Sequence, residues 1–206
     1  AAEAESVLDD CLHMVSAEIE KKHQTLTVSK NIIYPYIYMD ISRFTEIILN
    51  LISNAIKYTG EGGTIHCSVR QLPAQKDGRC IQELSVSDNG IGMSEEFQEH
   101  IFESFTRERS STVSGVEGTG LGMGIVKKLV EMMHGEIKIP SRMGEGSTFT
   151  IRIPCRIATV EDTQTKRAQV HPDGKPLVGK RILLAEDNDL NAEIAIALLE
   201  EEGLLV

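Results

Sequence analysis

Residues 50–59, NLISNAIKYT, lie in a longer amphipathic pattern that decides the fold. At about 100° per residue, Asn50, Asn54 and Lys57 fall on one narrow stripe of a helix. Two carboxamides one turn apart, followed by a cation, indicate a binding surface, although an ordinary polar face is the alternative for this helix alone. Asp40 is a candidate N-cap and Gly60 a candidate terminator. The opposite stripe is apolar, which predicts packing against a core; its members are Ile41, Phe44, Ile48, Leu51 and Ala55.

Composition is typical of a globular chain with an ordinary core. Its 206 residues are 41% hydrophobic and 25% charged, which predicts one domain and a fragment of a second. The net charge of −10 argues against nucleic acid as a partner, because no basic stripe is available to neutralise phosphates. No apolar run approaches the roughly 18 residues of a membrane span. We therefore expect a cytoplasmic fragment without membrane contact, and an anchor elsewhere in a longer parent protein stays open.

Four scattered cysteines form no C-x-x-C pair, which predicts reduced structural thiols instead of a disulfide framework or zinc site; they are Cys11, Cys67, Cys80 and Cys155. Around the central helix, periodicity alternates between helical and strand-like segments. Residues 32–39 are interrupted by Pro35, which favours an edge strand or an extended segment. The other expected elements are helices at 6–22 and 94–101, strands at 26–28, 64–71 and 81–87, a helix after 118–124 that ends at 134, and hairpin strands at 136–139 and 148–153.

The strand at 81–87 runs directly into Asp88-Asn89-Gly90-Ile91-Gly92-Met93. A carboxylate at the end of a buried strand is costly unless it meets a partner. Gly90 and Gly92 would let a backbone approach a neighbouring group closely. A simple turn is the alternative interpretation for this segment taken alone.

Two further segments are typical of an anion site. Residues 106–117 are polar and contain Arg107, which predicts a mobile loop that acts as a lid. Residues 118–124, GTGLGMG, then open a helix, and glycines at a helix N-terminus expose amide N–H groups to phosphates. This stretch lacks the Lys-Ser/Thr pair of a P-loop, so it is weak as a pattern by itself.

Four motifs occur in order: N-x-x-x-N-A-x-K-Y at 50–58, D-x-G-x-G-M at 88–93, F-E-x-F at 102–105 and G-T-G-L-G-x-G at 118–124. Together they resemble the catalytic, ATP-binding domain of a sensor histidine kinase, over residues 6–154. The resemblance implies an α/β (α+β) two-layer sandwich in which a mixed sheet is backed by three helices. It also implies a domain that binds Mg-ATP and donates the γ-phosphoryl group to a histidine of another domain.

The same resemblance implies roles for the polar stripe and the lid. Asn54 would coordinate Mg²⁺, with Asn50 assisting directly or through water. Lys57 would contact phosphate, and these three residues would be the catalytic set. Arg107 would reach the γ-phosphate, with a solvated loop cation as the alternative. Glu46 lies one turn before Asn50 and is a weak candidate for a base.

The base-binding side follows from the remaining motifs. Tyr58 would stack beside adenine, with ordinary helix-end packing as the alternative. Asp88 would accept a hydrogen bond from the exocyclic amine, and Gly90 and Gly92 would make room for the base. The other cofactor-binding residues implied are Met93, Phe105, Gly118, Thr119, Gly120, Leu121, Gly122, Met123 and Gly124.

The C-terminal segment is expected to be separate. We predict a catalytic domain at 1–157, a linker at 158–179 and, at 180–206, a fragment that resembles the first strand and helix of a receiver domain. Glu186 and Asp187 match a receiver's acidic pair but form an incomplete metal site, because the phosphorylatable aspartate would lie on a later strand. The fragment's first strand would also lack sheet neighbours, so we expect it to associate with another molecule.

The resemblance also implies partners. None of the six histidines is followed by an acidic residue, so the phosphoacceptor is expected on a separate dimerisation domain, and a response-regulator receiver domain would take the phosphoryl group next. An ATP hydrolase of the same fold and a degenerate scaffold are the alternatives. Such hydrolases place a general-base glutamate four residues before the metal-binding asparagine, whereas this chain has Asn50, which cannot accept a proton from water.

Overall fold

The computed structural model of the chain describes residues 2–3, 6–103, 106, 120–162, 179–185, 189–201 and 203–205. The chain divides into two compact units, Ala1–Thr163 and Gln164–Val206, which are taken separately below.

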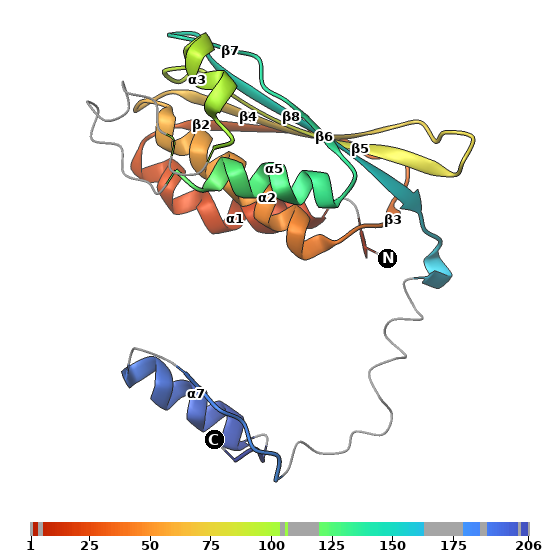
Figure 1. The fold of residues 1–206 in the computed structure, drawn as a ribbon, viewed down its shortest axis with the longest axis vertical. Coiled ribbons are helices and arrows are strands. Elements are labelled where there is room, and N and C mark those ends of the chain that lie inside the picture. Colours follow the sequence, from red (N-terminus) through yellow and green to blue (C-terminus); the bar gives the residue numbers. More distant parts are fainter. Residues whose placement is uncertain are drawn as a thin grey trace. The chain divides into compact units, whose positions relative to one another are not determined.

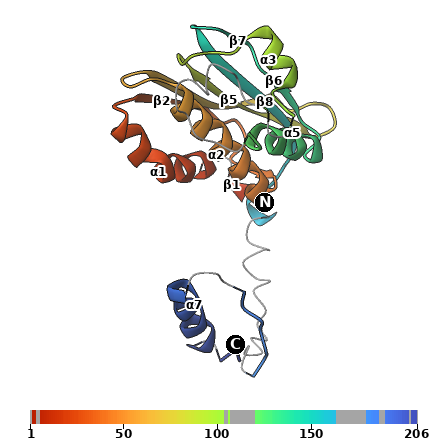
Figure 2. The same ribbon diagram turned by 60° about the vertical axis from the view of Figure 1, so that its left-hand side comes forward.

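The first unit is a two-layer α/β sandwich in which three helices lie on one face of a mixed sheet (Figures 1 and 2). Its strand order is β1-β3-β8-β5-β4-β2, and β6 and β7 also pair with β8. The expected fold class is therefore confirmed. The helices are α1 (Ser6–Lys21), α2 (Ile41–Tyr58), α3 (Glu95–His100) and α5 (Gly122–Met132), of which α1, α2 and α5 form the layer on the sheet; the strands are β1 (Ala2–Glu3), β2 (Thr25–Asn31), β3 (Tyr36–Tyr38), β4 (Thr64–Leu72), β5 (Arg79–Asp88), β6 (Glu136–Lys138), β7 (Ser141–Arg142) and β8 (Gly146–Ile157).

Alternation along the central strands separates the two faces of the sheet. In β4, Ile65, Cys67 and Val69 are buried toward the helices, while the residues between them are more exposed. β2 pairs with β4 in parallel, and the other pairings are antiparallel. One face of the sheet therefore supplies half of the core, and the other face stays open to solvent.

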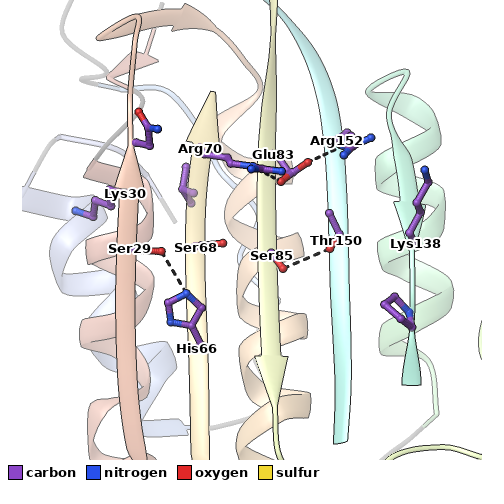
Figure 3. A pocket seen from close by; sticks show the side chains of 13 residues that line it. Ser29, Lys30, His66, Ser68, Arg70, Glu83, Ser85, Lys138, Thr150 and Arg152 are labelled. Carbon is purple, nitrogen blue, oxygen red and sulfur yellow. Dashed lines mark hydrogen bonds and ion pairs between the residues drawn. The ribbon is translucent and has the colours of Figure 1, made fainter. Parts of the chain in front are cut away.

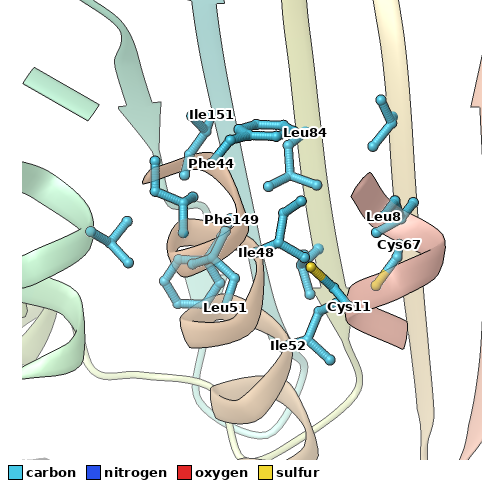
Figure 4. Packing of buried hydrophobic residues seen from close by; sticks show 14 of the residues in the cluster. Leu8, Cys11, Phe44, Ile48, Leu51, Ile52, Cys67, Leu84, Phe149 and Ile151 are labelled. Atoms are coloured by element: carbon cyan, nitrogen blue, oxygen red, sulfur yellow. The ribbon is translucent and has the colours of Figure 1, made fainter. Parts of the chain in front are cut away.

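Helix α2 supplies the other half of the core, packed against the sheet between α1 and α5 (Figure 4). Asp40 caps its first turn by accepting a hydrogen bond from the Arg43 backbone N–H at 3.1 Å, as expected. Ile41 was expected in the core but is 45% exposed; it is the first residue of α2, and burial begins only at Phe44. The buried α2 residues are Phe44, Ile47, Ile48, Leu51, Ile52, Ala55 and Ile56.

Two expectations about strands are wrong in detail. Residues 32–39 were expected to form an edge strand or an extended segment; β3 covers only Tyr36–Tyr38 of them and is not at the edge, because the two-residue β1 pairs with its outer side. The strand expected at 148–153 is longer, because β8 begins at Gly146 and continues to Ile157. Pro154 is tolerated there because, among the described residues, β6 pairs with β8 only up to Arg152 and β3 only from Arg156, so the proline interrupts no ladder on that side.

The second unit contains α7 (Asp189–Glu201), within the segment 180–206 where one strand and one helix were expected. Residues 181–185 were expected to form a strand with no neighbour. Arg181 instead forms an isolated parallel bridge with Leu205. The Ile182 N–H donates to the Leu205 carbonyl and the Leu205 N–H donates to the Lys180 carbonyl, each at 2.8 Å. The end of the chain therefore supplies a partner that sequence reasoning did not foresee, while Glu186 and Asp187 lie outside the described residues.

Candidate functional site

A cavity of about 430 Å³ opens in the helical layer, beside the C-terminal half of α2. Its walls come from α2, the end of β5 and the loop that follows, α3, the start of α5 and the start of β8. It is lined by Asn50, Ser53, Asn54, Lys57, Tyr58, Asp88, Ile91, Gly92, Met93, Phe97, Ile101, Thr106, Gly120, Gly122, Met123, Ser147 and Phe149.

The polar wall is the stripe of α2 that carries Asn50, Asn54 and Lys57. The Asn50 Nδ2 donates to the Glu46 carbonyl at 2.8 Å, so its Oδ1 remains an acceptor. A Cβ placed on Gly122 would lie 2.7 Å from that Oδ1, so a larger residue at this position would displace the Asn50 side chain. Glu46 itself is exposed and does not line the cavity.

Two side chains just after α1 hydrogen-bond to the last turn of α2. The Lys22 Nζ donates to the carbonyls of Ile56, Lys57 and Thr59, at 2.7, 3.0 and 3.3 Å. The Gln24 Nε2 donates to the carbonyls of Ile56 and Thr59 at 3.0 and 2.8 Å. Carbonyls at a helix C-terminus lack intrahelical partners and carry partial negative charge, so a cation there both caps and stabilises the helix.

The same turn presents Lys57 and Tyr58 to the cavity. The Lys57 ammonium lies 5.2 Å from the centroid of the Tyr58 ring, in a cation–π arrangement. Lys22 and Gln24 therefore position the part of α2 from which these two side chains project.

Asp88 ends β5 at the floor of the cavity, between Ile65 of β4 and Ser147 of β8 in the sheet register. Burial raises the pKa of the Asp88 carboxyl above its usual value, and backbone hydrogen bonds from Gly90 and Ser147 offset only part of that rise. The Gly90 N–H donates to Oδ1 at 2.9 Å. Asp88 is thus a desolvated acceptor held at a fixed place.

Glycines allow the loop after Asp88 to touch both neighbours. A Cβ on Gly90 would come within 2.4 Å of the Tyr58 carbonyl oxygen, and one on Gly92 within 1.8 Å of the Arg142 carbonyl oxygen. Gly92 also has φ of +65°, which favours glycine. The Ile91 N–H donates to the Tyr58 carbonyl at 3.2 Å, which ties this loop to the end of α2.

The remaining wall is apolar. Met93, Ile101, Met123 and Phe149 are each no more than 8% exposed, so they form a dry part of the lining. Ile91 and Phe97 extend it. A flat apolar group that carries one hydrogen-bond donor would fit between this wall and Asp88.

The N-terminus of α5 borders the cavity beside the carboxamides. Its N-cap residue, Leu121, makes no side-chain capping bond, so among the described residues no capping side chain occupies the first amide N–H groups. Gly120, with φ of +70°, turns the chain into the helix. This arrangement suits an anion.

Most of the residues singled out in the sequence meet in this one cavity. Gly90, Leu121 and Gly124 adjoin its lining without being part of it. Phe105, Arg107, Gly118, Thr119 and most of the expected lid lie outside the described residues. The predicted residues that line it are Asn50, Asn54, Lys57, Tyr58, Asp88, Gly92, Met93, Gly120, Gly122 and Met123.

Sequence reasoning missed several lining residues. Ser53 lies one turn from Lys57 on α2, and helical periodicity could have indicated it. Ser147 and Phe149 come from β8, far from the motifs in sequence, and carried no signal. The others are Ile91, Phe97, Ile101 and Thr106.

Comparison with known proteins identifies the class. The family described as Histidine kinase-, DNA gyrase B-, and HSP90-like ATPase matches residues 39–157, more than half of the chain. The chain therefore belongs to this ATPase family, as its fold and the site at α2 also indicate.

Within this family, the chain is similar to sensor kinases. The chain is 39% identical to sensor histidine kinase AruS of Pseudomonas aeruginosa over 77% of its own length, and 38% identical to the autoinducer 2 sensor kinase/phosphatase LuxQ of Vibrio vulnificus over 82%. It spans only 15% of AruS and 20% of LuxQ. The crystal structure of full-length ShkA in complex with AMPPNP has the same fold, with a TM-score of 0.64 at 24% identity over 99% of this chain and 39% of ShkA.

Among the described residues, no helix is long and apolar enough to cross a membrane.

Proposed function

We propose that the chain binds Mg-ATP in the α2 cavity and supplies the γ-phosphoryl group to a histidine on a separate dimerisation domain, in two-component signalling. The observation that carries the proposal is the division of one cavity into three zones. These zones are a carboxamide stripe, a helix N-terminus whose N-cap residue makes no side-chain capping bond, and a dry wall with a buried carboxylate.

The polar zone fits a metal–triphosphate group. Asn54 and Asn50 offer neutral oxygen ligands of the kind that Mg²⁺ accepts alongside its own waters. Bound Mg²⁺ supplies neutralisation of phosphate charge. Lys57 adds a second positive charge on the same stripe, and the amides at the start of α5 add donors.

The apolar zone fits the adenine ring. Asp88 accepts a hydrogen bond from the exocyclic amine, and its fixed, desolvated position gives that contact a strong preference for a donor. Met93, Met123 and Phe149 cover the faces of the ring with apolar surface.

Phosphoryl transfer to an acceptor is favoured over hydrolysis. The α2 residue one turn before Asn54 is Asn50, a carboxamide whose Nδ2 donates to the Glu46 carbonyl. A carboxamide cannot take a proton from water. Glu46 is exposed and does not line the cavity. The chain therefore positions ATP and neutralises its charge, and the nucleophile comes from a partner.

The second unit fits the start of a receiver domain, as part of a hybrid kinase. This part of the proposal is supported by the parallel bridge between Arg181 and Leu205, which lie on either side of α7. Two parallel segments joined through a helix follow the strand–helix–strand order of a parallel sheet. The partners are then a histidine-bearing dimerisation domain and a response-regulator receiver domain, in the cytoplasm, whether or not the parent protein is membrane-anchored.

The test uses ATP labelled on the γ-phosphate. The chain alone should remain unlabelled and release negligible phosphate, and a two-helix dimerisation domain from a sensor histidine kinase should become labelled in an acid-labile form when added. An Asn54→Ala variant should abolish that labelling, and a dimerisation domain without its histidine should stay unlabelled. Rapid phosphate release that survives further purification would instead indicate a hydrolase.

A further inference from the structure

The open face of the sheet holds a second cavity, of about 580 Å³, on the side away from the helices and the α2 cavity (Figure 3). Its floor is a row of small hydroxyl side chains that crosses four strands in register. The row is Ser29, Ser68, Ser85 and Thr150, and Lys138 of β6 continues it opposite Thr150. Small side chains in register leave a shallow transverse groove.

The next row forms one wall of this groove. Glu83 of β5 lies between Arg70 of β4 and Arg152 of β8. Its carboxylate, whose side chain is 6% exposed, accepts hydrogen bonds from the Nε atoms of Arg70 and Arg152 at 2.5 and 2.6 Å. One buried carboxylate therefore fixes two guanidiniums side by side.

Both guanidiniums keep donors for a ligand. Arg152 donates from Nη1 to Glu136 at 3.3 Å, which leaves Nη2. Among the described residues, no acceptor hydrogen-bonds to either Nη group of Arg70, whose side chain is 52% exposed. These donors border a floor of hydroxyls that can donate as well.

The charges around the groove favour an anion. Arg70, Arg152 and Lys138 still outnumber the two carboxylates that pair with them, Glu83 in the lining and Glu136 beside it. At the other end Lys30 is neutralised by Asp9 at 2.6 Å. This positive groove lies on a chain of net charge −10, so it is a local exception to the surface around it.

The length of the groove indicates which kind of anionic ligand fits it. From β2 to β6 it crosses four strand spacings of about 4.8 Å each, or about 19 Å. A single small anion would contact one end only, whereas about six residues of extended polypeptide span that length. Three cations are too few for the many phosphate contacts that nucleic-acid binding requires.

We propose that this groove binds an extended acidic segment of a partner protein, with carboxylates against Arg70, Arg152 and Lys138 and polar backbone groups against the hydroxyl floor. The site lies on the opposite face of the sheet from the α2 cavity, so the proposal does not depend on nucleotide binding.

The test titrates the full chain with a fluorescein-labelled eight-residue peptide of alternating Glu and Ala, followed by fluorescence anisotropy, beside the same peptide with Gln in place of Glu. Only the Glu peptide should bind, and more weakly as salt rises. Arg70→Gln should reduce its affinity about tenfold. Lys76→Gln, the same loss of charge in the exposed loop 73–78, should leave it unchanged.

Ser68→Tyr fills the floor without touching the core face, so it provides a second variant should Arg70→Gln lower stability. It should also abolish peptide binding, while nucleotide binding and the thermal unfolding temperature stay as in the original chain. Equal binding of the Gln peptide, or equal loss in Lys76→Gln and Arg70→Gln, would overturn the proposal. So would competition by free glutamate at matched carboxylate concentration, which would indicate a single-anion site.

Discussion

At the scale of single residues, a substitution of Asp88 tests the nucleotide proposal most directly. Asp88→Asn replaces an acceptor by an amide in a desolvated position, and the lost charge-assisted hydrogen bond should lower ATP-analogue affinity at least about tenfold. Calorimetric titration measures it. Asp77→Asn, the same change on an exposed loop carboxylate, should bind as the original chain does. An unchanged dissociation constant for Asp88→Asn would reject the adenine role.

The raised pKa of Asp88 adds a pH dependence. Only the ionised carboxylate is a full acceptor, so affinity should fall as pH is lowered through the raised pKa, starting above the ordinary value of 3.8. The Asp88→Asn variant should lack this component while retaining the effect of protonating the nucleotide's phosphates. Parallel pH profiles for the two proteins would contradict the assignment.

Gln82 is a polar residue in the core whose burial no described side-chain hydrogen bond offsets. It is fully buried on the helix-facing side of β5, and neither its Nε2 nor its Oε1 has a hydrogen-bond partner among the described residues. Gln82→Leu should therefore raise the free energy of unfolding by about 1–3 kcal/mol, measured by chemical denaturation.

Gln71, its partner in the register, is the matched control. Its Oε1 accepts from the Ile33 and Tyr34 N–H groups, at 2.9 and 2.6 Å, so Gln71→Leu should lower stability. If both changes destabilise the chain, Gln82 has a partner that this packing does not reveal.

At the scale of elements, the end of α2 depends on Lys22. Lys22→Met removes three donors from the last carbonyls of the helix. It should lower the free energy of unfolding by about 1–2 kcal/mol, and it should also weaken nucleotide binding, because Lys57 and Tyr58 project from that turn. Denaturation and calorimetry on the same samples measure the two effects.

Lys21→Met is the control, since Lys21 is an exposed neighbour at the end of α1. Lys22→Arg should restore part of both losses, because a guanidinium can still donate to carbonyls. A loss of stability with unchanged nucleotide affinity would limit Lys22 to a structural role.

At the scale of the whole molecule, the second unit remains expected to associate. Large apolar side chains are exposed on it, and Leu183 is 95% exposed beside the bridge at Arg181. Exposed apolar edges pair with other chains. Light scattering should show concentration-dependent dimers for residues 1–206 and monomers for residues 1–163.

The shorter version must keep β8 whole, since Ile157 pairs with Ile37 of β3. Leu183→Lys in the full chain should abolish association without changing the unfolding of the first unit. Monomers of both lengths at high concentration would refute the expectation.

Local pattern was sufficient for the longer helices and strands and for much of the candidate site, but not for the two-residue strands β1 and β7. Helical periodicity and capping chemistry act over one or two turns, so α2, its Asp40 cap and the stripe of Asn50, Asn54 and Lys57 could be predicted from sequence. The strand ending in a costly carboxylate likewise indicated Asp88. These features depend on residues that are neighbours along the chain.

Contacts between distant segments were decided only by the tertiary structure. Ser147 and Phe149 reach the cavity because β8 lies beside β5, and Lys22 reaches the end of α2 because α1 packs against that helix. The groove on the open face exists because Ser29, Ser68, Ser85 and Thr150 share one register row. Strand register is fixed by long-range pairing, and a shift of one residue would turn each side chain to the opposite face.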